Sequence, residues 1–127
     1  MFEIAVEHEF CAAHALSISG VRETLHGHNF HITVGIRGKT TDADGLLCDF
    51  HTVRELLMEL VEPFDNANLH ETDAFRDSNP SAENIAKYFG DTLGQRLDDS
   101  LAPHARVAWV RVTEAPGCAA TYWRTQP

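Results

Sequence analysis

Histidines are the residues of this chain whose type and spacing most clearly suggest chemistry. The chain has eight, and four of them, His14, His26, His28 and His31, fall within eighteen positions. His26 and His28 are two residues apart, so on a β-strand both imidazoles project from one face and can share a metal ion. If His14 pairs alongside, three neutral nitrogens and an open position form the ligand set of a catalytic zinc site. The same spacing also occurs among histidines that pack in a core or lie on a surface.

Two stretches that flank these histidines alternate between apolar and polar residues. In residues 2–11 most apolar side chains face one way and the glutamates face the other, and residues 29–38 repeat this pattern. Alternation with a period of two predicts two half-buried strands. The segment Ala12–His28 contains Gly20 and mixed polar residues, so we expect a long connection, a kind of segment that often carries function.

A first helix is predicted in the middle of the chain. Asp49 is a suitable N-cap, and the apolar residues of 50–61 recur at helical spacing until Pro63 ends the pattern. Just before the cap, Leu46–Cys48 is expected to form a short strand.

A second helix and two further strands complete the pattern. Asn79 is predicted to cap the helix, Pro80 to occupy its first position, and Glu83 to benefit from the positive end of the helix dipole. Residues 107–113 and 119–124 are rich in β-forming residues and are separated by a turn sequence, which is typical of a hairpin. The order of elements predicts an α+β fold, with an antiparallel sheet of about four strands and two helices on one face.

Length, charge and cysteine content restrict the class of protein. The 127 residues are expected to form one domain, 1–127. The net charge of −9 argues against a nucleic-acid partner, and no apolar run reaches the roughly 20 residues of a membrane helix. Cys11, Cys48 and Cys118 are odd in number and widely spaced, which argues against disulfides and favours a role in packing. Acidic residues stand where a signal peptide would carry bases, so we expect a cytoplasmic protein.

The open edges of a small sheet favour pairing with other chains. A homo-oligomer is therefore expected, and a cyclic assembly would cover these edges.

Four segments together resemble the 6-pyruvoyl/6-carboxy-tetrahydropterin synthase family. Their order and spacing match the family from residue 2 to about residue 124, and the segments are Phe10–His14, Leu25–Phe30, Asn79–Asn84 and Val112–Glu114. The resemblance implies a tunnelling fold in which three subunits close their sheets into a barrel and two trimers stack as a hexamer. It also implies active sites at the subunit interfaces.

Several site residues are implied by the same resemblance. His14, His26 and His28 are expected to bind Zn²⁺. Glu114 is expected to anchor a pterin, because a carboxylate can accept two parallel N–H bonds from the ring edge. Ser81 is expected to contact the same ring.

The chain departs from the family pattern at the proton-transfer positions. The best-known members carry a cysteine shortly before the histidine pair, whereas this chain has Glu23, which makes Glu23 the candidate base unless it simply faces solvent. The usual Asp-His pair is represented by Asp65 and Asn66, and an amide cannot titrate. His70, four residues further on, is the candidate substitute.

The resemblance implies a zinc-dependent lyase that acts on the side chain of 7,8-dihydroneopterin triphosphate. Zinc acts as a Lewis acid there, and a base removes a carbon-bound proton. The nearest bases in sequence for the triphosphate are Arg22, Arg37 and Lys39.

The expected product is 6-carboxy-5,6,7,8-tetrahydropterin, in the queuosine pathway. A glutamate-type variant would instead give 6-hydroxymethyl-7,8-dihydropterin, a folate precursor, and the missing cysteine argues against the 6-pyruvoyl product. The altered proton-transfer positions would also suit a repurposed homologue that binds a pterin with altered or no catalysis. A metal-free structural domain, in which the histidines only pack, would bind no stoichiometric zinc.

Overall fold

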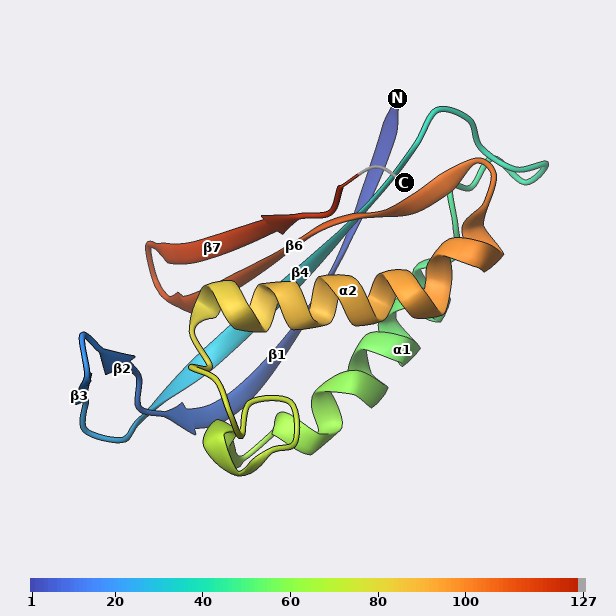
Figure 1. Ribbon diagram of the computed structural model, residues 1–127. Coiled ribbons are helices and arrows are strands. Elements are labelled where there is room, and N and C mark those ends of the chain that lie inside the picture. The colour runs from blue at the N-terminus through green and yellow to red at the C-terminus, as the bar shows by residue number, and fades with distance from the viewer. Residues whose placement is uncertain (126–127) are drawn as a thin grey trace.

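The computed structural model describes residues 1–125 and consists of a sheet covered on one face by two helices (Figure 1). The strand order in the sheet is β5-β1-β4-β6-β7. The strands are β1 (Phe2–His14), β4 (His26–Gly38), β5 (Ala67–Asn68), β6 (Ala105–Ala115) and β7 (Cys118–Trp123). All neighbours are antiparallel except β5, which pairs with β1 in parallel. The predicted α+β fold is therefore confirmed, with the two-residue β5 added to the four long strands.

Helices α1 (Phe50–Val61) and α2 (Ala82–Leu101) bury their apolar residues against the sheet. In β4, every second side chain from Phe30 to Ile36 is fully buried, because this row faces the helices. From α2, the buried partners include Ile85, Phe89 and Leu93. The core thus lies between one face of the sheet and the two helices.

Strands β1 and β4 are longer than the alternation predicts. Their antiparallel ladder runs without a break from Phe2 opposite Gly38 to His14 opposite His26. The main-chain pairing continues past the point where the side chains stop alternating, because main-chain hydrogen bonds do not depend on side-chain polarity. The predicted long connection is therefore shorter than expected.

A small hairpin forms most of that connection. Strands β2 (Ser17–Ile18) and β3 (Val21–Arg22) are joined by Ser19 and Gly20, which both have positive φ. Positive φ at both central residues is the geometry of a tight hairpin turn. The hairpin projects at the end of the sheet where β1 finishes and β4 begins (Figure 1).

The start of α1 agrees with the prediction, but the segment before it does not. The Asp49 side chain accepts a hydrogen bond from the His51 amide at 2.8 Å and so caps the helix. Leu46–Cys48 is not a strand, since it pairs with no other strand among the described residues. It is a loop in which Leu47 is buried in the core and accepts a hydrogen bond from His104. The helix ends at Val61, and a 3₁₀ turn, η1 (Glu62–Phe64), follows it.

Helix α2 begins later than predicted, because Ser81 rather than Asn79 is its N-cap. The Ser81 hydroxyl accepts a hydrogen bond from the Asn84 amide at 3.1 Å, and Ala82 is the first helical residue. The Asn79 side chain instead holds the main chain of Ser17, through its amide and its carbonyl oxygen. The prediction that Pro80 starts the helix was therefore also wrong.

Strands β6 and β7 extend further into their hairpin than predicted. Ala115 pairs with Cys118, so the turn consists of Pro116 and Gly117, and Gly117 has a φ of +80°. Glu114 lies at a register shift in this ladder, between Thr113 and Ala115.

No helix within residues 1–125 combines the length and apolar character that crossing a membrane requires.

Candidate metal centre and active site

The register of β1 with β4 brings three histidines together at the end of the sheet. His14 pairs with His26 and Ala12 pairs with His28, and the three imidazoles project from the face that carries the core. Their ligand nitrogens lie within 4.8 Å of one another. Phe30 packs edge-on against His14 and His28, with ring centroids 5.5 and 5.4 Å apart. The cluster therefore continues the buried row of β4 back to His26, the first residue of that strand.

Main-chain carbonyl groups orient two of these imidazoles. His14 Nδ1 lies 2.8 Å from the carbonyl oxygen of Pro80, and His26 Nδ1 lies 2.8 Å from that of Thr24. A carbonyl oxygen only accepts, so each Nδ1 carries the proton and donates it. The Nε2 atoms of the neutral rings are then left with free lone pairs. This arrangement, in which one ring nitrogen is held by an acceptor and the other is free, is typical of metal-binding histidines.

His28 supplies the third nitrogen, and its environment favours the neutral ring. Its Nε2 is the one buried side-chain nitrogen or oxygen that lacks a hydrogen-bond partner within residues 1–125. Burial lowers the pKa of His28, and nearby His14 and His26 lower it further, while the carboxylates of Glu114 and Glu23 act in the opposite direction. An unpaired buried nitrogen is costly unless it finds a partner. A divalent cation bound by all three Nε2 atoms fits this donor set.

Two carboxylates flank the cluster. Glu114 Oε1 lies 3.2 Å from His14 Nε2 and 3.9 Å from His28 Nε2. A β-bulge commonly re-aims a side chain beside a functional site, and Glu114 occupies such an irregularity. On the other side, Glu23 Oε1 lies 4.0 Å from His26 Nε2 and accepts a hydrogen bond from the Leu16 amide at 2.8 Å.

The other candidate residues, Asp65, His70 and Ser81, make no hydrogen bond or ion pair to the three histidines within residues 1–125 and are bonded to other groups instead. Asp65 accepts a hydrogen bond from the Cys11 amide at 3.1 Å. His70 Nε2 accepts a hydrogen bond at 3.1 Å from the main-chain amide of Ala15, the residue that follows His14 in the chain. Ser81 caps α2, and the preceding Pro80 carries the carbonyl group that holds His14.

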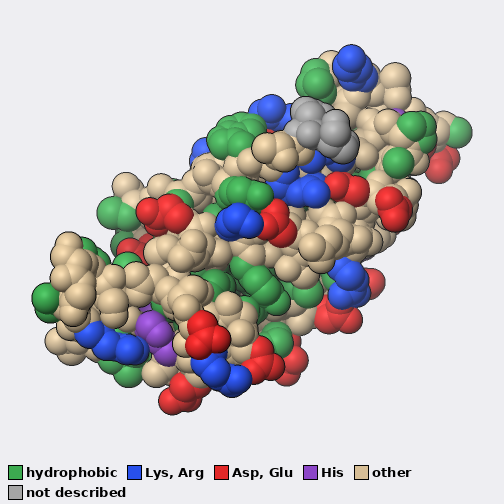
Figure 2. Space-filling view, in the orientation of Figure 1, with side chains coloured by type: hydrophobic (Ala, Val, Ile, Leu, Met, Phe, Trp, Pro, Cys, Tyr) green, Lys and Arg blue, Asp and Glu red, His purple; other side chains and the backbone are tan. Residues whose placement is uncertain are grey.

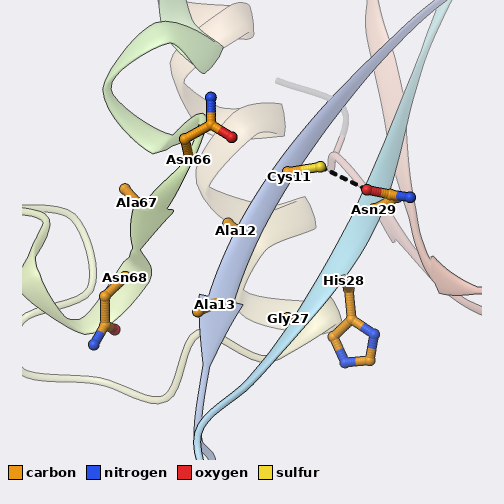
Figure 3. Close-up of a pocket in the computed structure, with 9 residues that line it drawn as sticks. All are labelled: Cys11, Ala12, Ala13, Gly27, His28, Asn29, Asn66, Ala67 and Asn68. Carbon is orange, nitrogen blue, oxygen red and sulfur yellow. Dashed lines mark hydrogen bonds between the residues drawn. The ribbon is translucent and has the colours of Figure 1, made fainter.

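A pocket of about 470 Å³ opens beside the cluster, between the ends of β1 and β4 and the segment around β5 (Figure 3). The residues that line it are Cys11, Ala12, Ala13, Gly27, His28, Asn29, Asn66, Ala67 and Asn68. Cys11 Sγ contacts Asn29 Oδ1 at 2.6 Å across the two strands (Figure 3). Asn66 has a φ of +58°, and its main-chain N–H donates a hydrogen bond to the Cys11 carbonyl oxygen.

The expectation that the cysteines pack in the interior was wrong for two of them. Cys11 and Cys118 are exposed, and Cys48 is partly buried, where burial raises its thiol pKa. Cys11 projects from the open face of β1, opposite to the row of buried residues. Its place in the pocket was missed because the sequence offered no signal for it beyond its position in the alternating strand.

A second pocket, of about 410 Å³, lies on the other side of the start of β4. It is lined by Glu114 and Thr113 from β6 and by Glu9 from β1, and it shares Gly27, His28 and Asn29 with the first pocket. Two of the three imidazoles are reachable from solvent, since the side chains of His26 and His28 are 39% and 21% exposed. Figure 2 shows histidine surface at the end of the molecule that carries the β2–β3 hairpin.

Two of the three bases considered for a triphosphate lie far from the cluster within one chain. Arg37 is near the opposite end of β4 from His26, roughly 35 Å away along the strand. Together with Lys39 it lines a separate pocket of about 490 Å³, next to Arg106 and Arg124. Arg22, in β3, remains at the histidine end.

Comparisons with known proteins agree with this architecture. The family model for 6-pyruvoyl tetrahydropterin synthase matches residues 3–125. A protein of Archaeoglobus fulgidus, provisionally named 6-carboxy-5,6,7,8-tetrahydropterin synthase, is 33% identical over 93 residues, which are 73% of this chain and 76% of that protein. The dihydroneopterin monophosphate aldolase of Pyrococcus furiosus is 32% identical over 88 residues, which are 69% of this chain and 71% of the aldolase.

Among solved structures, the 6-pyruvoyl tetrahydropterin synthase of Caenorhabditis elegans superposes with a TM-score of 0.83 at 21% identity and covers 98% of this chain and 96% of that chain. At this identity the superposition establishes the fold alone. The match of the family model over nearly the whole chain goes further: this chain belongs to the 6-pyruvoyl tetrahydropterin synthase family.

Proposed function

We propose that this chain is a zinc-dependent lyase that acts on the side chain of 7,8-dihydroneopterin triphosphate. The observation that carries the proposal is the convergence of three imidazoles, of which two are oriented by carbonyl groups and the third has an unpaired buried nitrogen. The family membership and the names of the related proteins supply the class of substrate.

His14, His26 and His28 would hold the zinc ion through Nε2. When bound, zinc supplies Lewis acidity that stabilises negative charge on the oxygens of the substrate side chain. The protein contributes the fixed orientation of the rings, because the Pro80 and Thr24 carbonyl groups hold two of them in place. Fixed ligands keep the open side of the site directed toward the substrate.

Glu23 is the proposed base that removes the carbon-bound proton. Its carboxylate lies 4.0 Å from His26 Nε2, and the Leu16 amide holds the same oxygen at 2.8 Å. This hydrogen bond fixes the carboxylate at the rim of the cluster, so a carbon-bound proton of a substrate side chain held at the cluster would be within its reach. Cys11 projects from the opposite face of the sheet from the histidines, and its thiol contacts Asn29, so within one chain it is not placed to act as this base.

Glu114 and Ser81 are the proposed contacts to the pterin ring. A carboxylate can accept a pair of N–H bonds from the pyrimidinone edge of a pterin. The Ser81 oxygen already accepts from the Asn84 amide, but its hydroxyl can still donate.

Asp65 and His70 are the proposed partners in proton transfer, and we propose that they act in an oligomer. Within one chain their contacts are to Cys11 and Ala15 rather than to the cluster. A barrel of three subunits, stacked as a hexamer, would bring sites to the interfaces between chains. The exposed Ile18 and Val21 of the hairpin and Trp123 of edge strand β7 are apolar surface that such an assembly could cover. Sedimentation equilibrium tests this, and a monomer at micromolar concentration contradicts it.

The proposed product is 6-carboxy-5,6,7,8-tetrahydropterin, the product in the name of the Archaeoglobus fulgidus relative. A second candidate is 6-hydroxymethyl-7,8-dihydropterin, favoured by Glu23 at the position where a cysteine was expected. Incubation of zinc-loaded protein with 7,8-dihydroneopterin triphosphate, followed by mass spectrometry of the pterin, separates these two from the 6-pyruvoyl product. Pterin binding without any product at full zinc loading would instead identify a repurposed binding protein.

A further inference from the structure

We propose that Glu114 is a fourth protein ligand of the metal in the substrate-free enzyme and leaves the metal when the pterin substrate binds. The inference rests on the proposed function, since it requires a metal at the three histidines. It concerns a residue that the family resemblance assigns to the pterin ring alone.

The distances around Glu114 are those of ligands that share one ion. A tetrahedral zinc with bonds of about 2.0–2.1 Å has its ligand atoms roughly 3.3 Å apart. Glu114 Oε1 lies 3.2 Å from His14 Nε2 and 3.9 Å from His28 Nε2. The carboxylate oxygen is thus already at the spacing that coordination requires from His14, and it lies further than that spacing from His28.

The chemistry of the His14–Glu114 contact also points to a cation between the two atoms. The Nδ1 proton of His14 is donated to the Pro80 carbonyl, so Nε2 of the neutral ring faces the carboxylate with a lone pair. Two acceptors this close repel each other. Water screens the repulsion little, because the His14 side chain is 1% exposed and the Glu114 side chain 28% exposed. With the metal bound, the ion itself is what holds the two groups together.

The second nearby carboxylate, Glu23, does not meet these conditions. Its Oε1 is 4.0 Å from His26 Nε2, and the Leu16 amide already donates to it. Within residues 1–125, the polar contacts of the Glu114 carboxylate are to ring nitrogens of His14 and His28, and no main-chain amide holds it as the Leu16 amide holds Glu23. The two carboxylates therefore have different tasks, with Glu23 held at the rim and Glu114 directed at the ligand nitrogens.

A carboxylate in this position cannot at the same time anchor the pterin. The pyrimidinone edge and the reactive side chain lie at opposite ends of the fused ring, so a group that binds the far edge cannot stay beside the ion that holds the side chain. Glu114 must therefore move if it serves both. Its place at a register shift at the end of β6 gives it a main chain that is less tightly paired than the rest of the ladder.

Coordination by Glu114 has a functional consequence. It would close the metal to water in the resting enzyme, and the substrate oxygens would take the position that the carboxylate leaves. The open position of a catalytic zinc would then be created by the substrate itself.

The test measures metal binding rather than turnover. We would compare the wild type, Glu114→Gln and the matched control Glu9→Gln, an exposed glutamate that lines the same pocket and pairs with His31 at 3.9 Å. Zinc affinity is measured by competition with a chromophoric chelator, and the ligand field by the visible spectrum of the Co²⁺-substituted proteins. Loss of an outer partner of a metal ligand typically costs about 10–100-fold in affinity, so loss of a direct ligand should weaken zinc binding at least that much.

The expected result is weaker zinc binding and an altered Co²⁺ spectrum for Glu114→Gln, with Glu9→Gln unchanged. Far-UV circular dichroism checks that each variant is folded, and Glu114→Ala provides a second substitution. Addition of 7,8-dihydroneopterin to the Co²⁺-loaded wild type should change its spectrum as the carboxylate is replaced. That arm requires no variant.

Three contrary results would each have a distinct meaning. Equal zinc affinities and identical Co²⁺ spectra for the wild type and Glu114→Gln overturn this inference and leave the proposed function standing. An unchanged wild-type spectrum with dihydroneopterin shown to be bound overturns the release of Glu114. Failure of the wild type to bind zinc or cobalt overturns the proposed function itself.

Discussion

His14 Nδ1 donates a hydrogen bond to the carbonyl oxygen of Pro80, 2.8 Å away, and this contact joins the end of β1 to the start of α2. Pro80 stands directly before Ser81, the N-cap of that helix. The capped helix therefore fixes the orientation of a histidine that lies 66 residues earlier in the chain. Any change to this contact should affect both the fold and the proposed metal site.

Replacement of His14 by alanine should reduce both metal binding and stability. His14 is 1% exposed, so the change leaves a cavity and a Pro80 carbonyl group without its partner, which costs about 1–3 kcal/mol. We expect loss of stoichiometric zinc by elemental analysis and a lower free energy of unfolding in urea with a chelator present. His31→Ala, at a side chain that is 54% exposed, is the control and should change neither. Full zinc occupancy in His14→Ala would remove His14 from the ligand set.

Replacement of Glu23 by glutamine should stop the chemistry and spare the metal. Glutamine retains an oxygen that can accept the hydrogen bond from the Leu16 amide, but it cannot take up a proton. A general base typically contributes about 10²–10⁴-fold to the rate, so turnover should fall by that factor at unchanged zinc content. Glu83→Gln, in the exposed first turn of α2, is the control for a lost charge. If turnover survives in Glu23→Gln, another group is the base.

A methyl group at Gly35 should destabilise the fold. The indole of Trp109 crosses β4 at this point, and a Cβ on Gly35 would lie 2.1 Å from Trp109 Cε2. Overpacking of this kind typically costs about 1–3 kcal/mol, which urea denaturation of Gly35→Ala can measure. Gly27→Ala is the control in the same strand, because its Cβ would meet only the Ala12 carbonyl oxygen at 3.6 Å. The cost of Gly35→Ala should shrink in a Trp109→Ala background, and an unchanged cost there would contradict the steric explanation.

The Glu3 carboxylate should contribute stability that depends on pH. The hydrogen bond from Trp109 Nε1, at 2.9 Å, lowers the pKa of Glu3; burial opposes this shift, and the Arg37 guanidinium adds to it. A pKa that is lower in the folded than in the unfolded chain gives stability that is present above the unfolded pKa of about 4.3. That stability is lost as the pH falls through the folded value.

We therefore expect wild type and Glu3→Gln to differ most in their free energy of unfolding near neutral pH and to converge in acid. The side chain is 37% exposed, so the difference should be small, about 0.2–1 kcal/mol. Urea denaturation at several pH values between about 3 and 7 measures it. A difference that grows as the pH falls would contradict the assigned sign.

Much of the fold followed from local patterns in the sequence. The alternation of apolar side chains predicted the positions of β1 and β4, and Asp49 predicted the start of α1, because side-chain periodicity and capping are properties of neighbouring residues. Apart from Leu46–Cys48, which is a loop rather than the expected strand, the errors lay at the ends of elements. Asn79 and Ser81 are both good caps by type, and the choice of Ser81 depended on Asn79 binding the main chain of Ser17, a contact between segments far apart in the sequence.

The sequence by itself determined which residue types were available for chemistry and that His26 and His28 share a face, since the period of a strand is two. Only the tertiary structure decided that His14 stands opposite His26, that Pro80 and Thr24 orient two of the rings, and that Glu114 turns toward their nitrogens. The physical reason is that register, bulges and carbonyl contacts arise where distant segments pair. The hydrogen bonds that fix these features join segments far apart in the chain, and a pattern of neighbouring residues carries no information about which distant segments will pair.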